Sequence, residues 1–270
     1  DAVAPLLGQV LPRDAEMAPM PGFGLDAVGD TAAKAGNGVI RKYRGRALLV
    51  ATGSCAVNCR YCFRRHFPYA EETAAAGGWR EAIELIRADD SIDEVILSGG
   101  DPWSLATAKL AELTDALATV PHLRRLRVHT RLPVVLPERV DTALLEWVAR
   151  LPWPLTVVLH VNHANEFDAS VDAALARLRQ AGANLLNQAV LLRGVNDNVD
   201  ALADLCERGY RAGVLPYYLH QLDRVQGAAH FEVPDEQARA LHSALAARLS
   251  GYLVPRLVRE VAGDTGKRPL

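Results

Sequence analysis

The chain has 270 residues, 50% of them hydrophobic, which suits one large domain with a substantial buried core. Lys and Arg number 30 against 32 for Asp and Glu, so the net charge is -2. This balance argues against nucleic acid or an anionic membrane surface as a partner. The apolar stretches are far shorter than a membrane span, and no secretion signal is recognisable, so we expect a cytoplasmic protein.

Regular apolar patterning begins only after the first 45 residues. Residues 1–45 are rich in Pro and Gly, and we expect them to form an irregular extension packed on the core. From residue 46, short apolar runs typical of buried parallel strands alternate with segments of helical period. The runs are 47–51, 94–97, 126–129, 155–161, 185–191 and 214–219. The helical segments are roughly 79–88, 104–119, 137–150, 168–181, 198–211 and 235–250.

This alternation of six strands with six helices predicts an α/β fold with a parallel sheet and right-handed crossovers. Periodicity alone leaves open whether the sheet is open or forms a partial barrel. In both cases the loops that follow the strands meet at one edge. Polar residues concentrate in those loops, which predicts a functional site; they lie at 55–62, 98–101, 129–131, 160–163, 188 and 217–223.

Three of the four cysteines are crowded into eight residues. Cys55, Cys59 and Cys62 have Cys-x3-Cys-x2-Cys spacing. Three thiolates this close cannot all pair as disulfides within the motif, but they can ligate three irons of a 4Fe-4S cluster and leave the fourth iron open. The alternatives are a zinc site completed by His66, or buried free thiols. The fourth cysteine, Cys206, lies on a predicted helix and is expected in the core.

The cysteine motif resembles the signature of radical S-adenosylmethionine enzymes, because it follows the first strand and has Tyr61 immediately before its third cysteine. The resemblance implies a partial (β/α)6 barrel over residues 46–251, with a cluster whose open iron binds S-adenosylmethionine. It also implies which residues contact that cofactor. They are a glycine-rich segment (Ser98, Gly99, Gly100 and Asp101), together with His160 and Gln188.

Further stretches resemble lysine 2,3-aminomutases. They include CFRRHF at 62–67, LHVNHANE at 159–166, NQAVLLRGVND at 187–197 and PYYL at 216–219. The resemblance runs from about residue 43 to 267, and it is closest to the branch that makes (R)-β-lysine for modification of elongation factor P. It implies an isomerase that converts L-lysine to (R)-β-lysine.

The resemblance implies a second cofactor, pyridoxal 5′-phosphate. Lys267, in a C-terminal segment of residues 252–270, matches the lysine that bonds to it, although such a lysine is otherwise typical of a solvated tail. Tyr43, Lys42 and Arg46 match positions that contact its ring and phosphate, and the planar fork of arginine suits phosphate oxygens.

The same resemblance assigns substrate contacts. Arg64 matches the arginine that pairs with the α-carboxylate, and Asp223 matches a carboxylate that receives the distant ammonium. Glu260 stands where aminomutases of free lysine have a second aspartate, so its longer side chain changes the geometry there.

The implied partners are lysine, a reductant protein for the cluster, and a lysine ligase that acts on elongation factor P. Three other functions are weighed against this one. The first is an aminomutase for glutamate or arginine, of which glutamate is disfavoured because Asp223 and Glu260 would repel a second carboxylate. The others are a non-catalytic iron–sulfur redox protein and a zinc-binding interaction module.

Overall fold

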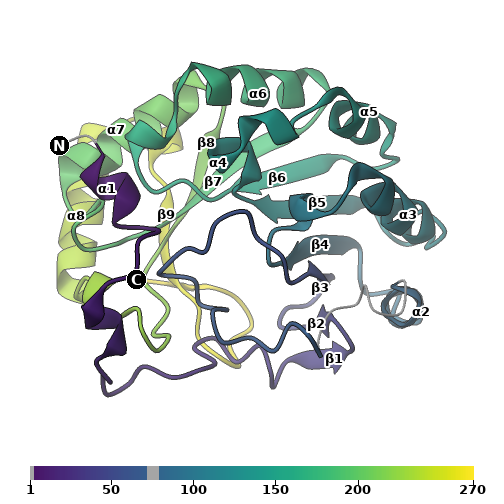
Figure 1. Cartoon of the computed structure of the whole chain (residues 1–270), viewed down its shortest axis with the longest axis horizontal. Helices are drawn as coiled ribbons and strands as arrows, with labels where there is room; N and C mark the ends of the chain where they lie inside the picture. The colour runs from purple at the N-terminus through teal and green to yellow at the C-terminus, as the bar shows by residue number, and fades with distance from the viewer. Residues whose placement is uncertain (1–2, 72–78) are drawn as a thin grey trace.

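One ten-stranded sheet organises the chain in the computed structural model, which describes residues 3–71 and 79–270 (Figure 1). The strands lie in chain order from β1 to β10. Strands β3 to β9 run parallel to one another, whereas β1 and β2 at one edge and β10 at the other are added by antiparallel pairing. The strands are β1 (Lys34–Gly36), β2 (Val39–Ile40), β3 (Arg46–Thr52), β4 (Glu94–Gly99), β5 (Arg125–Thr130), β6 (Leu155–Leu159), β7 (Asn184–Val190), β8 (Leu215–His220), β9 (Arg256–Arg259) and β10 (Arg268–Pro269).

A helix follows each of the parallel strands β3 to β8, and Figure 1 shows these helices on the outer side of the curved sheet. Parallel neighbours require such crossovers, because a tight turn cannot return the chain to the same end of the sheet. The helices are α2 (Arg80–Arg87), α3 (Thr107–Leu117), α5 (Thr142–Arg150), α6 (Ala169–Gln180), α7 (Val199–Arg211) and α8 (Asp235–Arg248), with short helices α1 (Ala4–Leu7) and α4 (Leu132–Val135).

The main core lies between the sheet and these helices. Trp103 and Trp147 are among its largest fully buried side chains, and the indole nitrogen of Trp147 donates to Thr114 Oγ1 at 3.0 Å. Two helices start where the sequence offers a capping carboxylate: Asp141 accepts from the backbone before α5, and Asp168 does so before α6. Such caps satisfy backbone donors that the first helical turn leaves free.

The six predicted strands and six predicted helices are confirmed, with ends that differ by a few residues. The expected partial barrel is also confirmed, because the sheet is mostly parallel and, in the part of the chain described, β1 does not pair with β10. Four strands were not predicted: β1, β2, β9 and β10. They are two to four residues long, so the neighbouring strands rather than their own sequence patterns determine them.

The N-terminal extension is tied to the core at several points. Its strand β2 pairs with β3, and Gly24 exchanges backbone hydrogen bonds with the segment after β8, donating to Arg224 at 3.0 Å and accepting from Gln226 at 2.8 Å. The carboxylate of Glu16 accepts from Arg60 and Arg65 near the cysteines, with distances of 2.9 and 2.7 Å. The extension therefore lies against the loops at the carboxyl ends of the strands.

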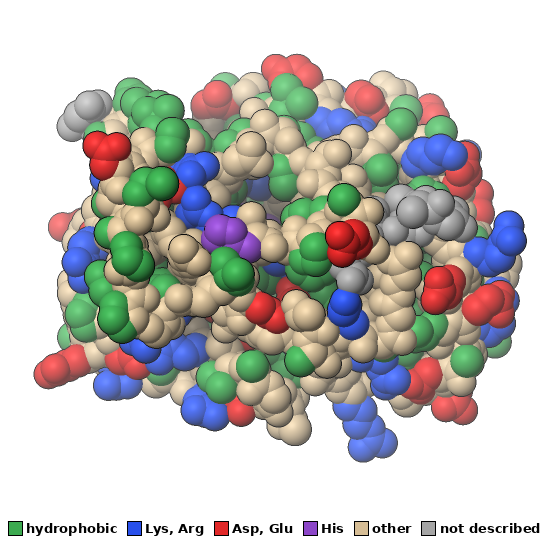
Figure 2. Space-filling model, turned by 60° about the horizontal axis from the view of Figure 1, so that its bottom comes forward, with side chains coloured by type: hydrophobic (Ala, Val, Ile, Leu, Met, Phe, Trp, Pro, Cys, Tyr) green, Lys and Arg blue, Asp and Glu red, His purple; other side chains and the backbone are tan. Residues whose placement is uncertain are grey.

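Among the described residues, none of the helices has both the length and the apolar character needed to cross a membrane. On the face in Figure 2, basic and acidic side chains are interspersed and do not form a patch of a single sign.

Candidate active site

A cavity of about 560 Å³ lies at the carboxyl ends of the parallel strands. Its wall includes residues from the two terminal parts of the chain, namely the N-terminal extension and the segment after β9. The structure brings every residue predicted for the site to this one wall: Lys42, Tyr43, Arg46, Cys55, Cys59, Cys62, Arg64, Ser98, Gly99, Gly100, Asp101, His160, Gln188, Asp223, Glu260 and Lys267. Their cofactor and substrate contacts stay predictions, whereas their proximity is a property of the fold.

The cysteine loop, residues 53–62, connects β3 to the cavity wall. All three of its thiols are free, and Cys55 is the most exposed of them. Partial burial raises the pKa of Cys55 to about 12, with further contributions from the carboxylate of Asp101 and from the other two cysteines. The three sulfurs thus lie close enough to repel one another as thiolates. A positively charged iron–sulfur core would relieve this repulsion, so the donor set fits a cluster.

The zinc alternative requires His66 to complete a set of ligands. Instead, the Nε2 atom of His66 lies 3.2 Å from the backbone oxygen of Gln226. Across residues 3–71 and 79–270, no three His, Cys, Asp or Glu side chains come together as ligands of a single metal ion. Thiols that ligate three different irons of one cluster lie farther apart than ligands of one ion, and the cluster stays a prediction for this loop.

Gly99 and Gly100, at the end of β4, allow the cysteine loop to pack closely against the β4 loop. A Cβ atom at Gly100 would lie 2.3 Å from the backbone oxygen of Ser54, and one at Gly99 would lie 2.4 Å from that of Thr52. Gly99 also has a φ of 118°, which L side chains rarely adopt. These glycines are therefore required by the approach of two loops. Contact with a cofactor remains a further prediction for them.

Asp101 supports the neighbouring loop rather than offering a free carboxylate. Its oxygens accept from the backbone of Trp103 at 3.0 Å, from Thr130 Oγ1 at 2.7 Å, and from the backbone of Arg131 and Leu132 at 2.7 and 3.2 Å. Because four protein donors occupy this buried side chain, it holds the end of β5 and the start of α4 in place.

A chain of ion pairs crosses the cavity wall. Lys267 pairs with Glu260 at 2.6 Å, and Glu260 pairs with Lys42 at 2.8 Å. Lys42 in turn pairs with Asp30 at 2.5 Å, and Asp30 pairs with Arg64 at 2.6 Å. Burial would raise the pKa of Glu260, but the two ammonium groups outweigh it and hold the pKa at about 2. The predicted lysine and the predicted substrate arginine are thus linked by alternating charges.

Lys42 and Glu260 already contact other residues of the wall, and their predicted contacts with cofactor and substrate stay predictions. The ammonium of Lys42 donates to Glu260 Oε1 and to the backbone oxygen of Val28, each at 2.8 Å, and forms an ion pair with Asp30. Glu260 accepts from Lys42 through Oε1 and from Lys267 through Oε2. Through Glu260, Lys42 and Lys267 are held at the same part of the wall.

Asp223 is the carboxylate that stays available. It is partly buried at the cavity wall, and its Oδ1 atom is buried with no hydrogen-bond partner in the described part of the chain. Burial is the main reason that its pKa rises to about 7, and the negative charge of Glu260 adds to the effect. A cationic group of a ligand would satisfy this oxygen and favour the ionised form.

Other buried polar atoms at the cavity wall also await partners. Within the described residues, Gln188 Oε1, His129 Nε2 and His220 Nε2 make no hydrogen bonds. Burial, followed by the charge of Arg131, lowers the pKa of His160 to about 4, so its imidazole is neutral. Since unpartnered buried groups cost free energy, this wall suits a large polar ligand such as S-adenosylmethionine.

Arg46 fits a phosphate. Its guanidinium stacks on the ring of Tyr43, with 4.6 Å between the Cζ atom and the ring centroid. Its Nε atom is buried and, in the residues that the structure places, has no acceptor. Arg46, Tyr43 and Lys267 share the same wall, so the residues present fit pyridoxal 5′-phosphate as well as the cluster.

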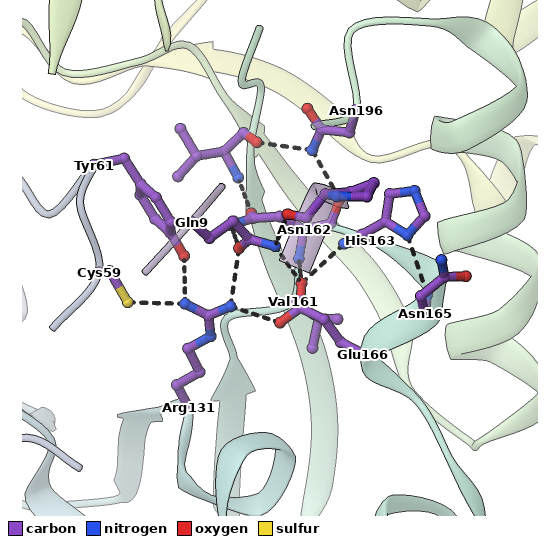
Figure 3. A network of polar contacts seen from close by, with 12 residues as sticks. Gln9, Cys59, Tyr61, Arg131, Val161, Asn162, His163, Asn165, Glu166 and Asn196 are labelled. Atoms are coloured by element: carbon purple, nitrogen blue, oxygen red, sulfur yellow. Dashed lines mark hydrogen bonds and ion pairs between the residues drawn. The ribbon is translucent and has the colours of Figure 1, made fainter. Parts of the chain in front are cut away.

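Sequence reasoning missed two residues that the site depends on. Asp30, 2% exposed, lies in the irregular extension, where no periodic pattern marks it. Arg131 was noted at a strand end but had no role; in the structure it binds Cys59, Glu166 and Gln9 (Figure 3). Two other residues from the strand-end segments lie elsewhere: Asn162 is buried in this network, and His163 caps the short helix at residues 164–166.

Comparisons with known proteins identify relatives of this chain. No protein-family model matches the chain. The chain is 49% identical over 266 residues to the L-lysine 2,3-aminomutase of Escherichia coli (strain K12), covering 98% of this chain and 78% of that protein. It is 45% identical over 263 residues to the enzyme of the same name from Haemophilus influenzae, covering 97% and 78%.

More distant relatives extend the comparison. Identity to the L-lysine 2,3-aminomutase of Clostridium subterminale is 34% over 234 residues, with 86% of this chain and 56% of that protein covered. Among solved structures, a radical SAM methyltransferase from Sphaerobacter thermophilus is similar with a TM-score of 0.52 and 19% identity, over 82% of this chain and 68% of that chain. At that identity the likeness concerns the fold alone.

Proposed function

Because the chain belongs to the lysine 2,3-aminomutase family of radical S-adenosylmethionine enzymes, we propose that it isomerises L-lysine to (R)-β-lysine. One observation carries the proposal: the cysteine motif, Lys267, Arg64 and Asp223 line a single cavity. A cluster protein without catalysis would not need a lysine and paired charges beside its thiols.

The residues present would hold three cofactors. Cys55, Cys59 and Cys62 would ligate the 4Fe-4S cluster, and Lys267 with Arg46 would hold pyridoxal 5′-phosphate. When bound, the cluster and S-adenosylmethionine supply hydrogen-abstracting radical chemistry, and pyridoxal phosphate carries the migrating amine. With these groups bound, exclusion of water from the cavity would protect reactive species from quenching.

Arg64 and Asp223 would fix the two ends of a diamino acid. The guanidinium of Arg64 is held by Asp30 at 2.6 Å and by Ser98 Oγ at 2.9 Å, so its direction is set before a substrate carboxylate arrives. Asp223 would receive the distant ammonium, and the fraction that is protonated near pH 7 would lose its proton on binding. Placement of both ends brings the middle of the substrate to the reacting groups.

Glu260 positions the Lys267 amine at the cavity wall. The contact of 2.6 Å joins β9 to the segment just before β10. The ring of Tyr218 lies 5.7 Å from the Lys267 ammonium and covers it from another side. The side chain of Lys267 is thereby kept beside the cavity rather than extended into solvent.

The partners follow from the same function. We infer that an electron-donor protein reduces the cluster, and that the product serves a ligase that modifies elongation factor P. The resemblance over residues 43–267 as a whole, which is closest to that branch, supports this assignment. A reducing cytoplasm suits the chain, because all four of its cysteines are free.

The test uses anaerobically purified protein and the Lys267→Ala variant. We expect the variant to lose the absorbance of bound pyridoxal phosphate and retain that of the iron–sulfur cluster. Lys109→Ala is the control, since Lys109 lies on the exposed face of α3 and pairs with Glu112. The wild-type protein should form β-lysine from lysine and should not act on glutamate or arginine. Absence of β-lysine from a fully loaded protein would refute the proposal.

A further inference from the structure

Arg131 connects four separate segments of the chain at the cysteine loop (Figure 3). It follows β5, and its Nη1 atom donates to Cys59 Sγ at 2.9 Å and to the Tyr61 hydroxyl at 3.1 Å. Its Nη2 atom donates to Glu166 Oε2 at 2.7 Å and to Gln9 Oε1 at 2.9 Å. Only 11% of its side chain is exposed, so these contacts are shielded from solvent.

The partners of Arg131 are themselves fixed. Glu166 Oε1 accepts from the backbone of Asn162 at 2.8 Å and of His163 at 3.0 Å, while its other oxygen faces the guanidinium. Asp101 holds the backbone nitrogen of Arg131. With its backbone and both of its terminal nitrogens held, the guanidinium has one orientation, with Nη1 directed at the Cys59 sulfur.

Gln9 brings the N-terminal extension into this network. Its side chain is fully buried, and its Oε1 atom accepts from both Arg131 and Asn162, each at 2.9 Å. Its backbone oxygen accepts from Arg60 in the cysteine loop at 2.8 Å. The same residue therefore contacts the loop and orients the cation that contacts the loop.

We propose that Arg131 is a positioning residue that directs a charge-assisted N–H···S bond at Cys59 and raises the reduction potential of a cluster held there, with Gln9 and Glu166 setting its orientation. The inference rests on the cluster proposed above. A reduced cluster carries one more negative charge, taken from an external donor. A fixed cation beside a ligand sulfur therefore stabilises the reduced form more than the oxidised form.

The test measures the cluster's midpoint potential by titration with dithionite, followed by electron paramagnetic resonance. We expect Arg131→Met to lower the ratio of reduced to oxidised cluster at a fixed potential about tenfold, since a hydrogen bond to a charged group is typically worth about that factor. For a one-electron couple this is about 59 mV. Arg131→Lys keeps the charge but cannot contact the Cys59 side and the Glu166 side through two separate nitrogens. The cluster's midpoint potential in this variant should therefore lie between those of wild type and Arg131→Met.

Gln9→Ala keeps the inference testable if Arg131→Met does not fold. It leaves the cation in place but frees its orientation, so the potential should fall in the same direction by a smaller amount. Leu11→Ala, at a half-exposed position on the same extension, and Arg150→Met, on the exposed face of α5, should not change it.

Two outcomes separate this inference from the proposed function. If Arg131→Met and Gln9→Ala both hold a cluster at the wild-type potential, Arg131 does not tune it and the inference fails while the function stands. If the anaerobic wild-type protein holds no iron and sulfide after reconstitution, both fail.

Discussion

Two carboxylates at the cavity wall have opposite environments at the residue scale. Glu260 lies between two ammonium groups, and its pKa falls to about 2. Asp223 lies on the same wall, and its pKa rises to about 7 because burial is not offset by a bonded cation. The environment rather than the residue type thus decides the pKa of each carboxylate, which supports the different roles proposed for Glu260 and Asp223.

The first prediction concerns Asp223 and pH. Since its folded pKa lies above the ordinary value, the native state binds more protons than the unfolded state between about pH 4 and 7. Its contribution to the free energy of unfolding therefore falls as pH rises through that range. Asp223→Asn should flatten this decline in urea unfolding of the cofactor-free protein. An exposed control, Asp90→Asn, should keep the wild-type slope, and equal slopes in both variants would contradict the assignment.

The second prediction concerns Glu260. Glu260→Gln leaves the Lys267 ammonium without its counter-charge, and we expect a loss of about 3 kcal/mol in the free energy of unfolding near pH 7. The stabilisation is present above pH 4.5, the ordinary pKa, and is lost as pH falls toward 2, so the variants should converge in acid.

Glu112→Gln provides the matched control for that measurement. It breaks an exposed pair with Lys109, which should cost about 0–1 kcal/mol. If Glu260→Gln and Glu112→Gln lose similar amounts of unfolding free energy, the Glu260–Lys267 pair is no stronger than an exposed pair.

At the scale of elements, the site depends on how the β3 and β4 loops meet. The backbone nitrogen of Gly100 donates to Thr52 at 2.7 Å, and that of Asp101 donates to Ser54 at 2.8 Å. These bonds continue the β3–β4 pairing beyond the strands and into the cysteine loop. The absence of side chains at positions 99 and 100 allows this approach.

The third prediction is that Gly100→Ala displaces the cysteine loop. The added methyl would overlap backbone rather than a flexible side chain, and we expect a loss of about 1–3 kcal/mol in unfolding experiments on the cofactor-free protein. The variant should also retain less iron after reconstitution. Gly251→Ala, where no heavy atom lies within 4 Å, should change neither quantity. Normal iron content in Gly100→Ala would overturn this account of the glycine.

At the scale of the whole molecule, the site is assembled by curvature of the sheet. In strand order, β3 and β9 are separated by five strands, yet Lys42 just before β3 bonds to Glu260 just after β9 at 2.8 Å. A flat sheet would hold these residues far apart, because neighbouring strands are spaced by about 4.8 Å. The curvature of the open sheet therefore brings the N-terminal extension and the segment after β9 together at the cavity.

The fourth prediction tests the last parallel strand. Leu257 is a buried residue of β9, and Leu257→Ala should cost about 2–4 kcal/mol of unfolding free energy. Because β10 pairs with β9, loosening this strand should also weaken binding of pyridoxal phosphate near Lys267. Arg256→Ala, at an exposed position on the same strand, is the control. Unchanged cofactor affinity in a clearly destabilised Leu257→Ala would show that β9 does not position the lysine.

Pattern strength explains which elements could be predicted. Strands β3 to β8 are five to seven residues long, and a helix of eight or more residues follows each of them. Their alternation is therefore visible in the sequence. Strands such as β2 and β10, with two residues each, have no pattern of their own. They exist because a neighbouring edge offers hydrogen-bonding groups.

The sequence by itself determined the chemistry of this protein: the cysteine spacing, the order of strands and helices, and the motifs that resemble the aminomutases. These depend on local spacing and residue identity. Tertiary structure alone decided that Asp30 joins Arg64 to Lys42, that Glu260 holds Lys267, and that Gln9 and Glu166 aim Arg131 at Cys59. Those contacts link residues up to 122 positions apart, and only the curvature of the sheet and the path of the extension bring them within bonding distance.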